Sequence, residues 1–325
     1  PPPPPPPPFS SRRRHTRYSL QSRGLGDVYK RQNPSILSGD IGTVGNVGDN
    51  SYHVVSAVNV NSTAVLSAVI VRDGYADAAG GGTLIDQGGG MVVSDGNPAV
   101  SNVMFINNYA INHGGAMATT NNAFPLVINC SFTGNRSGAN GGAFDSLRFG
   151  SPQIVNSTFT GNTAPQGAVT NLAVGGAAPR NSLVWGNDGP ELGDFSNTAD
   201  FDVAYSLIET LSVEIGSPPP LGGIGNIDGD PLFIDADGSD DQFGTIDDDT
   251  RLDRYSPAID AADVLAVPSD VIDLDSDADV TEPVSLDLFG SERYVSEPNV
   301  LNTGNGPPPI IDMGAHEFLD PDRIF

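Results

Sequence analysis

The chain has very little cysteine and little positive charge, and each shortage excludes a class of protein. Cys130 is the only cysteine among 325 residues, so no disulfide can form within the chain. Fifteen basic residues stand against 40 acidic ones, and the resulting net charge of −25 repels the phosphates of nucleic acid. No stretch approaches the roughly 18 apolar residues of a membrane-spanning helix. We therefore expect no nucleic-acid partner and no transmembrane segment.

Residues 1–32 differ in composition from everything that follows. They open with eight prolines and continue through a basic stretch that holds Lys30, the only lysine of the chain. The segment from Asp27 to Gln32 can be encoded by DNA that resembles a transposase-end adapter of sequencing libraries. We therefore interpret the block as a translated adapter artefact and expect it to be disordered. The alternative is a genuine Pro- and Arg-rich tail that binds an SH3-like domain or nucleic acid.

The remaining segment, 33–325, is strongly acidic, with 39 acidic residues, eight basic residues and no lysine. If the preceding block is an artefact, the authentic N-terminus lies upstream, and we expect any signal peptide or N-terminal cap to be missing from this sequence. Such acidity suits calcium binding or a salty exterior, and solubility alone explains it equally well.

A 27-residue internal repeat organises the first part of this segment. Its landmarks are phenylalanines and asparagines at constant spacing: Phe105, Phe132 and Phe159, and Asn108, Asn135 and Asn162. A fourth copy, offset by 25 residues, ends at Asn187. Self-similarity at such a period is typical of a solenoid, in which each unit buries its apolar face only by stacking on its neighbours.

Each repeat predicts short strands separated by sharp turns. Alternation along Leu126, Ile128, Cys130 and Phe132 places these side chains on one inward face, where we expect the repeated phenylalanines to stack. The repeated asparagines fall in the next turn, because asparagine tolerates the left-handed conformation and its stacked side chains can form a hydrogen-bonded ladder. After each asparagine turn, a Gly-Gly-Ala corner leads to the next short strand, because glycine permits the positive φ of a tight corner. Cys130 is expected to be a small buried side chain and not a nucleophile.

Short strands with no helical pattern between them favour an all-β fold, a right-handed parallel β-helix, over a βαβ fold. We expect its coils to occupy residues 33–225. Roughly six or seven coils, stacked at the sheet spacing of about 4.8 Å, would form a rod about 30 Å long.

The repeats resemble those of polymorphic outer-membrane proteins. Phe132-Thr-Gly-Asn135 and Phe159-Thr-Gly-Asn162 match the F-x-x-N motif, and Gly141-Gly-Ala-Phe144 approximates the G-G-A-I motif. Gln166-Gly-Ala-Val169 departs from it at the first glycine. The resemblance covers about residues 88–187 and implies a bacterial β-helix protein of the pectate-lyase-like fold, secreted or displayed on the outer cell surface and mostly adhesive. The same fold also hosts polysaccharide lyases and hydrolases, so it does not decide function.

Residues 226–325, here called the tail, hold 25 acidic residues and four arginines. The order of three motifs, at 228–235, 255–260 and 311–318, resembles the C-terminal region of many bacterial β-helix repeat proteins, where it closes the rod. An open end would expose unpaired backbone and apolar core. We therefore expect the tail to be an acidic, loop-rich cap and not an independent catalytic domain.

One acidic run of the tail is a candidate calcium loop. Its carboxylates alternate along the chain and end with a glutamate: Asp273, Asp275, Asp277, Asp279 and Glu282. Alternate carboxylates can converge on one calcium ion, which takes six to eight oxygen ligands. The run departs from an EF-hand loop, because Ala278 stands where glycine is required. Looser candidates lie at 235–241 and 247–249, and the alternative for all three runs is a solvated loop without an ion.

No catalytic constellation stands out in the sequence. A β-helix lyase needs a basic side chain beside calcium, but the authentic segment has no lysine and its coil arginines are scattered. A glycoside hydrolase needs paired carboxylates. We interpret Asp145 as a surface residue, His113 as a polar choice at a turn, and His316 as part of the capping motif.

These observations favour a non-catalytic protein that is secreted or attached to the outer cell surface. We predict a monomer that has an adhesive or structural role or contacts polysaccharides or host-cell glycans, with calcium stiffening its acidic end. The alternative is a polysaccharide lyase or glycoside hydrolase whose carboxylates converge in space but not in sequence.

Overall fold

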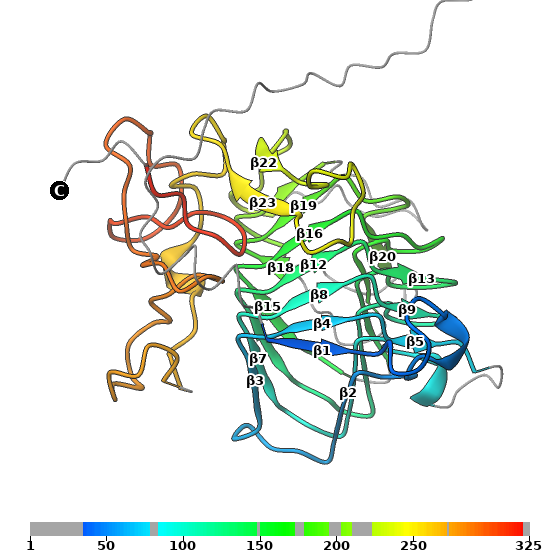
Figure 1. Cartoon of the computed structure of the whole chain (residues 1–325). Coiled ribbons are helices and arrows are strands. Elements are labelled where there is room, and N and C mark those ends of the chain that lie inside the picture. Colours follow the sequence, from blue (N-terminus) through cyan, green and yellow to red (C-terminus); the bar gives the residue numbers. More distant parts are fainter. Residues whose placement is uncertain are drawn as a thin grey trace, which may run out of the picture.

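A computed structural model describes residues 35–78, 84–147, 150–172, 179–194, 203–209, 223–271 and 273–320. Its regular structure is almost entirely β, and most strands form parallel sheets stacked along one axis (Figure 1). Short 3-10 helices occur at η1 (Val47–Asp49), η2 (Leu84–Asp86) and η3 (Val264–Ala266). The block interpreted as a translated adapter, residues 1–32, lies outside the described residues.

Successive strands visit four parallel sheets in turn, an arrangement consistent with a parallel β-helix. Sheet A holds β1 (Ile36–Ser38), β4 (Ile70–Arg72), β8 (Met104–Ile106), β12 (Ser131–Thr133), β16 (Thr158–Thr160), β19 (Leu183–Trp185) and β21 (Leu207–Ile208). Sheet B holds β2 (Val55–Val58), β6 (Met91–Ser94), β10 (Met117–Thr120), β14 (Phe144–Ser146), β17 (Thr170–Leu172) and β20 (Leu192–Asp194). Sheet C holds β3 (Val65–Ser67), β7 (Ala99–Ser101), β11 (Leu126–Ile128), β15 (Gln153–Val155) and β18 (Pro179–Arg180). Sheet D holds β5 (Tyr75–Ala76), β9 (Tyr109–Ala110) and β13 (Arg136–Ser137).

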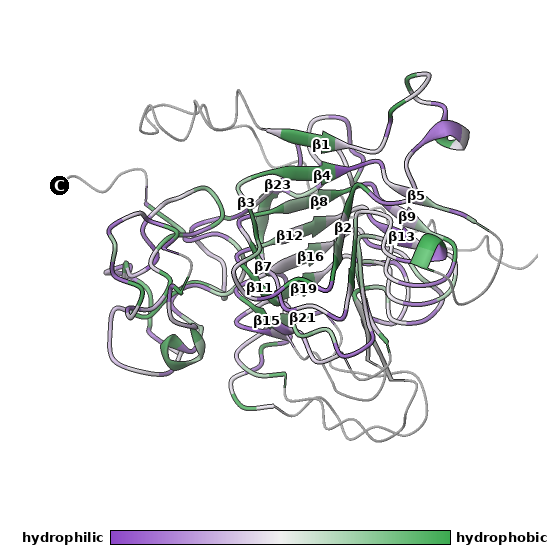
Figure 2. Cartoon of the chain, turned by 90° about the horizontal axis from the view of Figure 1, so that it is seen from below, coloured by the Kyte–Doolittle hydropathy of each residue, from purple (hydrophilic) through white to green (hydrophobic). Residues whose placement is uncertain are grey.

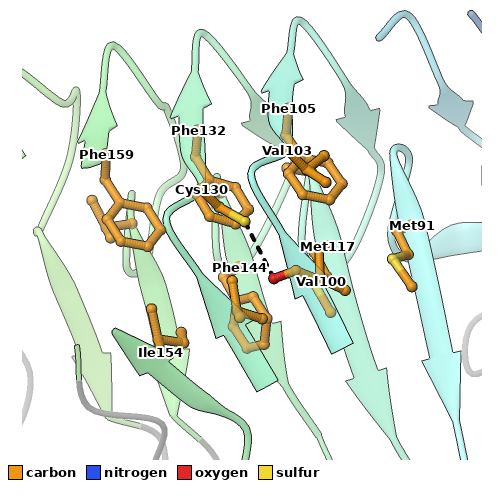
Figure 3. Close-up of a cluster of buried hydrophobic side chains, with 14 of the residues drawn as sticks. Met91, Val100, Val103, Phe105, Met117, Cys130, Phe132, Phe144, Ile154 and Phe159 are labelled. Carbon is orange, nitrogen blue, oxygen red and sulfur yellow. Dashed lines mark hydrogen bonds between the residues drawn. The ribbon is translucent and has the colours of Figure 1, made fainter. Parts of the chain in front are cut away.

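The strand register follows the sequence repeat. Phe132 pairs with Phe105 on one side and with Phe159 on the other. All three side chains are fully buried, and their rings stack at centroid distances of 4.9 and 4.7 Å (Figure 3). Cys130 is buried in the same cluster, and its burial raises the pKa of the thiol to about 12. The predicted inward stack and the interpretation of Cys130 as a small buried side chain are both confirmed.

The predicted inward face is wrong for two residues. Val127 packs in the core between the sheets, whereas Ile128 belongs to a second cluster outside them and Leu126 packs against that cluster. The reason is Asn129, whose φ of 52° makes a corner between β11 and β12. A left-handed residue turns the chain, so the alternation of one strand does not continue in phase into the next.

The repeated asparagines form the predicted ladder. Asn135 donates from Nδ2 to Asn162 Oδ1 at 3.0 Å and to the Phe105 carbonyl at 2.9 Å. Asn108 and Asn187 extend the same pattern on either side. The expected left-handed conformation falls elsewhere, because it belongs to the residue before the ladder position, as at Gly134 with φ 64°. The ladder asparagines thus serve hydrogen bonding and not the turn itself.

The tail begins by continuing the stack and then runs along the side of the coils. Ile227 pairs with Leu207 of β21, beyond which the chain forms the antiparallel pair β22 (Phe233–Asp235) and β23 (Asp249–Leu252). In Figure 2 the later part of the tail lies beside the coils, and its trace changes repeatedly between hydrophilic and hydrophobic colours. That the tail closes the end of the rod stays a prediction, and the side-on packing was not predicted.

Three corner asparagines and one threonine bind the tail from four successive coils. Asn102, Asn129 and Asn181 donate from Nδ2 to tail carbonyls at 2.5, 2.7 and 2.9 Å, and each has a positive φ. In the coil between Asn129 and Asn181, the Thr158 hydroxyl accepts the Ala315 N–H at 3.0 Å. These bonds fix the tail across the corner between sheets C and A.

An apolar cluster lies under the docked tail. From the coils it takes Ile128, Leu183 and Leu207, and from the tail Leu252, Ala258, Ile259, Ala261, Ala262, Val267, Val284, Ile311 and Met313.

On the opposite edge of sheet A, the loop around Phe243 lies against Gly134 and Gly161. Outward-facing hydroxyls between the two edges, such as those of Thr133 and Thr160, are consequently buried.

Candidate functional site

The candidate calcium loop projects from a short antiparallel base in the tail. Ser269 pairs with Pro283, the Asp270 N–H donates to the Glu282 carbonyl at 2.7 Å, and Val284 donates to Pro268 at 3.0 Å. Val284 is buried in the cluster under the tail. The base therefore anchors both ends of the acidic run to the coil-facing side of the tail.

One group of three carboxylates combines two residues of the predicted run, Asp275 and Glu282, with Asp270, which the alternating pattern did not include. Ligand oxygens of Asp270, Asp275 and Glu282 lie within 4.8 Å of one another. Asp270 is fully buried, and its Oδ1 has no hydrogen-bond partner, as is also true of the buried Oε1 of Glu282. Asp270 was missed because it precedes the alternating run and reaches the site through the fold of the base.

A second group shares Asp275 and stays within the predicted run. Oxygens of Asp273, Asp275 and Asp277 also lie within 4.8 Å of one another. The carboxylates of Asp273 and Asp277 accept loop N–H groups at 3.1 and 2.7 Å, which already satisfies part of their hydrogen-bonding capacity. Asp279 belongs to neither group and instead accepts the N–H and hydroxyl of Thr281. The structure thus brings together four of the five predicted ligands.

The looser candidates at 235–241 and 247–249 do not form such a group. Of the described residues, only the two groups above place three possible ligands within reach of one ion. Asp247 accepts instead from the Ser239 hydroxyl at 2.6 Å and the Thr245 hydroxyl at 2.7 Å, and these bonds lower its pKa to about 2. This loop is held by its own hydrogen bonds.

Crowding of negative charge marks the loop that could hold a metal ion. Burial, reinforced by Asp275 and Asp273, raises the pKa of Asp270. Burial, reinforced by Asp277, Asp275 and Asp279, raises the pKa of Glu282. Like charges this close disfavour each other's ionised form unless a cation or a proton compensates them. The donor set consists of carboxylate oxygens, which are the ligands that hard cations such as calcium and magnesium prefer.

A buried arginine ties the segment after the loop to the coils. Arg293 is fully buried, and its Nε donates to Asn129 Oδ1 at 3.1 Å. Its other nitrogens donate to the carbonyls of Gly314 at 2.7 Å and Asp312 at 3.4 Å, and Nη1 lies 3.7 Å from Glu317 Oε2. A buried charge of this kind requires such partners. Sequence reasoning missed Arg293, although a lone arginine between acidic residues was a usable signal.

A half-exposed column crosses sheet D on another side of the coils. The rings of Tyr75 and Tyr109 stack at 4.6 Å and tilt by 31°, and the Arg136 guanidinium lies 4.7 Å above the Tyr109 ring. Two further residues continue the column: Thr163 forms a parallel bridge with Arg136, and Asp188 forms one with Thr163. Aromatic and arginine side chains at a surface are typical of binding sites, and stacking along a solenoid also stabilises the fold.

Asp145 is not a surface residue, so that interpretation is wrong. It is fully buried on β14, and its Oδ2 lies 2.8 Å from Nδ1 of the partly exposed His113. The reason is the coil spacing, which places the turn before β10 beside the strand of the next coil. Asp86, also fully buried, accepts from Asn112 Nδ2 at 3.0 Å. His316 is buried in the tail, 3.3 Å from the Thr250 hydroxyl.

Comparison with known proteins adds no family. No family model matches the chain, and no curated protein matches it either. In the part of the chain that the structure describes, no helix is both long and apolar enough to cross a membrane.

Proposed function

We propose that the chain is a non-catalytic β-helix protein that acts outside the cell or on its outer surface by contacting glycans. In this proposal it is a monomer of right-handed coils related to polymorphic outer-membrane-protein repeats, and calcium stiffens its acidic tail. The F-x-x-N repeats support the relationship, and the three-carboxylate groups of the tail support the cation.

The observation that carries the glycan-binding role is the column of Tyr75, Tyr109 and Arg136. Tyr109 and Tyr75 keep part of their rings at the surface, and Arg136 is exposed beside them. Aromatic rings offer apolar contact to sugar rings, and a guanidinium donates in a planar fork to hydroxyl or carboxylate oxygens. The tail covers much of the outer face of sheet A, whereas this column on sheet D stays accessible.

Retention on polysaccharides tests this role directly. Residues 33–325 are passed over neutral and acidic polysaccharides, and both retention and newly formed chain ends are recorded. We expect retention without new ends, and loss of retention in Tyr109→Ala and Arg136→Ala. Tyr255→Ala is the matched control, because Tyr255 is 78% exposed in the tail, far from sheet D in sequence. Equal retention of all variants, or none of the wild type, would remove the column from the proposal.

The second candidate is a carbohydrate-active enzyme, and the pair of His113 and Asp145 favours it. A buried carboxylate that binds Nδ1 of a partly exposed histidine can orient that ring as a general base or acid. Asp86, buried one coil earlier and bonded to the residue before His113, supplies a further carboxylate. New chain ends that disappear in His113→Ala and persist in Tyr109→Ala would favour the enzyme over the binding protein.

A further inference from the structure

We propose that a divalent cation bound by Asp270, Asp275 and Glu282 fastens the tail to the side of the coils. The proposal rests on the calcium role given above and deepens it in two ways. It assigns the ion to a group that includes a residue outside the alternating run, and it gives the ion a mechanical task.

The choice between the two carboxylate groups follows from burial and hydrogen bonding. Carboxylates of both groups accept loop N–H groups, since Asp270 Oδ2 accepts from Leu274 at 2.8 Å, but those of Asp273, Asp275 and Asp277 are half-exposed or exposed. In the group of Asp270, Asp275 and Glu282, a fully buried carboxylate oxygen of Asp270 and a buried oxygen of Glu282 have no partner. An unpartnered buried oxygen is costly, and a cation among three carboxylates removes that cost.

The chemistry of the group fits calcium. Three carboxylates can supply up to six oxygens, and water can complete the six to eight that calcium takes. No arginine or histidine forms an ion pair with these carboxylates among the residues that the structure describes. When the three carboxylates are ionised, their negative charges are therefore left for an external ion to neutralise.

A short chain of contacts leads from the group to the coils. Asp275 Oδ2 accepts the Ser285 hydroxyl at 2.6 Å, and the Ser285 carbonyl accepts the Arg293 N–H at 2.8 Å. The next residue, Leu286, accepts Asn129 Nδ2 at 2.7 Å, and Arg293 Nε donates to the same asparagine. An ion that fixes Asp275 thereby fixes the two tail groups that bind Asn129, namely the Leu286 carbonyl and the Arg293 guanidinium.

The distal side of the group is anchored as well. Asp270 and Glu282 share a backbone hydrogen bond in the antiparallel base, and the neighbouring Val284 is buried under the tail. Without the ion, repulsion among the three carboxylates acts to open this base, because like charges at this separation disfavour the closed loop. The tail should then loosen from the coils while the coils keep their own stack.

Calcium titration and amide hydrogen exchange on the full chain test both parts. We expect calcium to bind, and Asp270→Asn to weaken the binding by roughly tenfold or more. Asp279→Asn is the comparison variant, because Asp279 lies in neither group and acts only through its charge near Glu282, so its loss should weaken the binding much less than Asp270→Asn does. Chelation should raise exchange in residues 284–294 and leave the strands around Phe132 protected. Circular dichroism of each variant checks that it is folded.

The outcomes separate the two proposals. No calcium binding by the wild type would overturn both this inference and the calcium role on which it rests. Binding that Asp279→Asn weakens and Asp270→Asn does not would overturn the assignment alone. Binding lost in Asp270→Asn, with exchange in 284–294 indifferent to calcium, would overturn the fastening while the calcium role stands.

Discussion

The coils are held together by contacts that repeat from coil to coil, whereas the tail is held by contacts that each occur once. In the coils, every turn repeats the same contacts, so that Phe132 stacks on its own equivalents and Asn135 bonds to its own equivalents. In the tail, contacts occur once, and single residues such as Arg293 join several segments. Repetition spreads stability over many similar interfaces, whereas the tail concentrates it in a few polar groups.

The largest expected effect is on the coil core. Phe132→Ala removes the middle ring of the stack and leaves a cavity, so we expect it to lower the free energy of unfolding by about 3–5 kcal/mol. Urea denaturation followed by circular dichroism measures this. Phe243→Ala is the control, because Phe243 is 39% exposed on the edge of sheet A. Equal losses for the two variants would mean that the stack is not the main support of the coils.

Arg293→Ala should damage the tail and spare the coils. It leaves the buried Asn129 Oδ1 and the Gly314 carbonyl without their donor and removes the charge partner of the buried Glu317, and breaking a buried pair costs about 3 kcal/mol or more. We expect a separate early unfolding step in the tail, seen as a red shift of the fluorescence of Trp185. This residue, the only tryptophan, packs partly buried against the apolar cluster under the tail. A single cooperative transition would show that coils and tail do not unfold separately.

Asn135→Ala should interrupt the ladder in its middle. The Phe105 carbonyl and the Asn108 N–H and side chain lose a buried partner, so we expect a loss of about 1–3 kcal/mol. Asn302→Ala, on the exposed part of the tail, should change stability by less than about 0.5 kcal/mol. A loss confined to the tail's unfolding step would contradict the assignment of the ladder to the coils.

With calcium removed by a chelator, acid should stabilise the tail. Burial raises the pKa of Asp312 from 3.8 to about 8 and that of Asp260 to about 6. A raised pKa in the folded state means that the folded chain binds more protons, so this stability is complete below about pH 4 and is lost as the pH rises to about 8. Each such proton changes the free energy of unfolding by about 1.4 kcal/mol per pH unit within the window.

Denaturation monitored by Trp185 between pH 5 and pH 8 measures this dependence. Asp312→Asn should flatten it, because the side chain at position 312 then no longer titrates. The stability of the coils should also fall as the pH rises, because burial raises the pKa of Glu191 to about 8. Tail stability that rises with pH would show that these carboxyls are ionised and paired in the folded chain.

The sequence predicts the coils better than the tail because their contacts are repeated. A stacked contact recurs at the repeat interval, so the spacing of Phe105, Phe132 and Phe159 is by itself enough to reveal the contact. Nothing repeats the bond between Arg293 and Asn129, which are 164 residues apart. Within the coils, the corner at Asn129 broke the predicted alternation because the conformation of one residue decides the facing of the next strand.

The candidate site shows the same limit. The alternating run predicted four of the carboxylates that the structure brings together, because neighbours in a tight loop stay close. Asp270 could not be predicted, because it reaches Asp275 and Glu282 only through the antiparallel base. The pairing of His113 with Asp145 was missed for a related reason, as its two members lie in different coils.

The smallest expected effect tests where the two regions touch. Gly161 and Gly186 occupy equivalent corners with φ of 65° and 69°, so replacing either by alanine costs about 1–2 kcal/mol for the left-handed conformation. At Gly161 the new Cβ would lie 2.2 Å from Phe243 Cγ, whereas at Gly186 it meets the same ring at 3.9 Å. Gly161→Ala should therefore cost about 1 kcal/mol more than Gly186→Ala.

Urea denaturation of a double-mutant cycle isolates that difference. When Phe243→Ala is added to each glycine variant, the excess cost of Gly161→Ala should vanish, because the ring that it displaces is gone. The cycle thereby measures the contact between the tail loop and the coil edge without removing either region. An excess that survives in the absence of the ring would arise within the coils, and the docking of this loop on sheet A would then contribute nothing to stability.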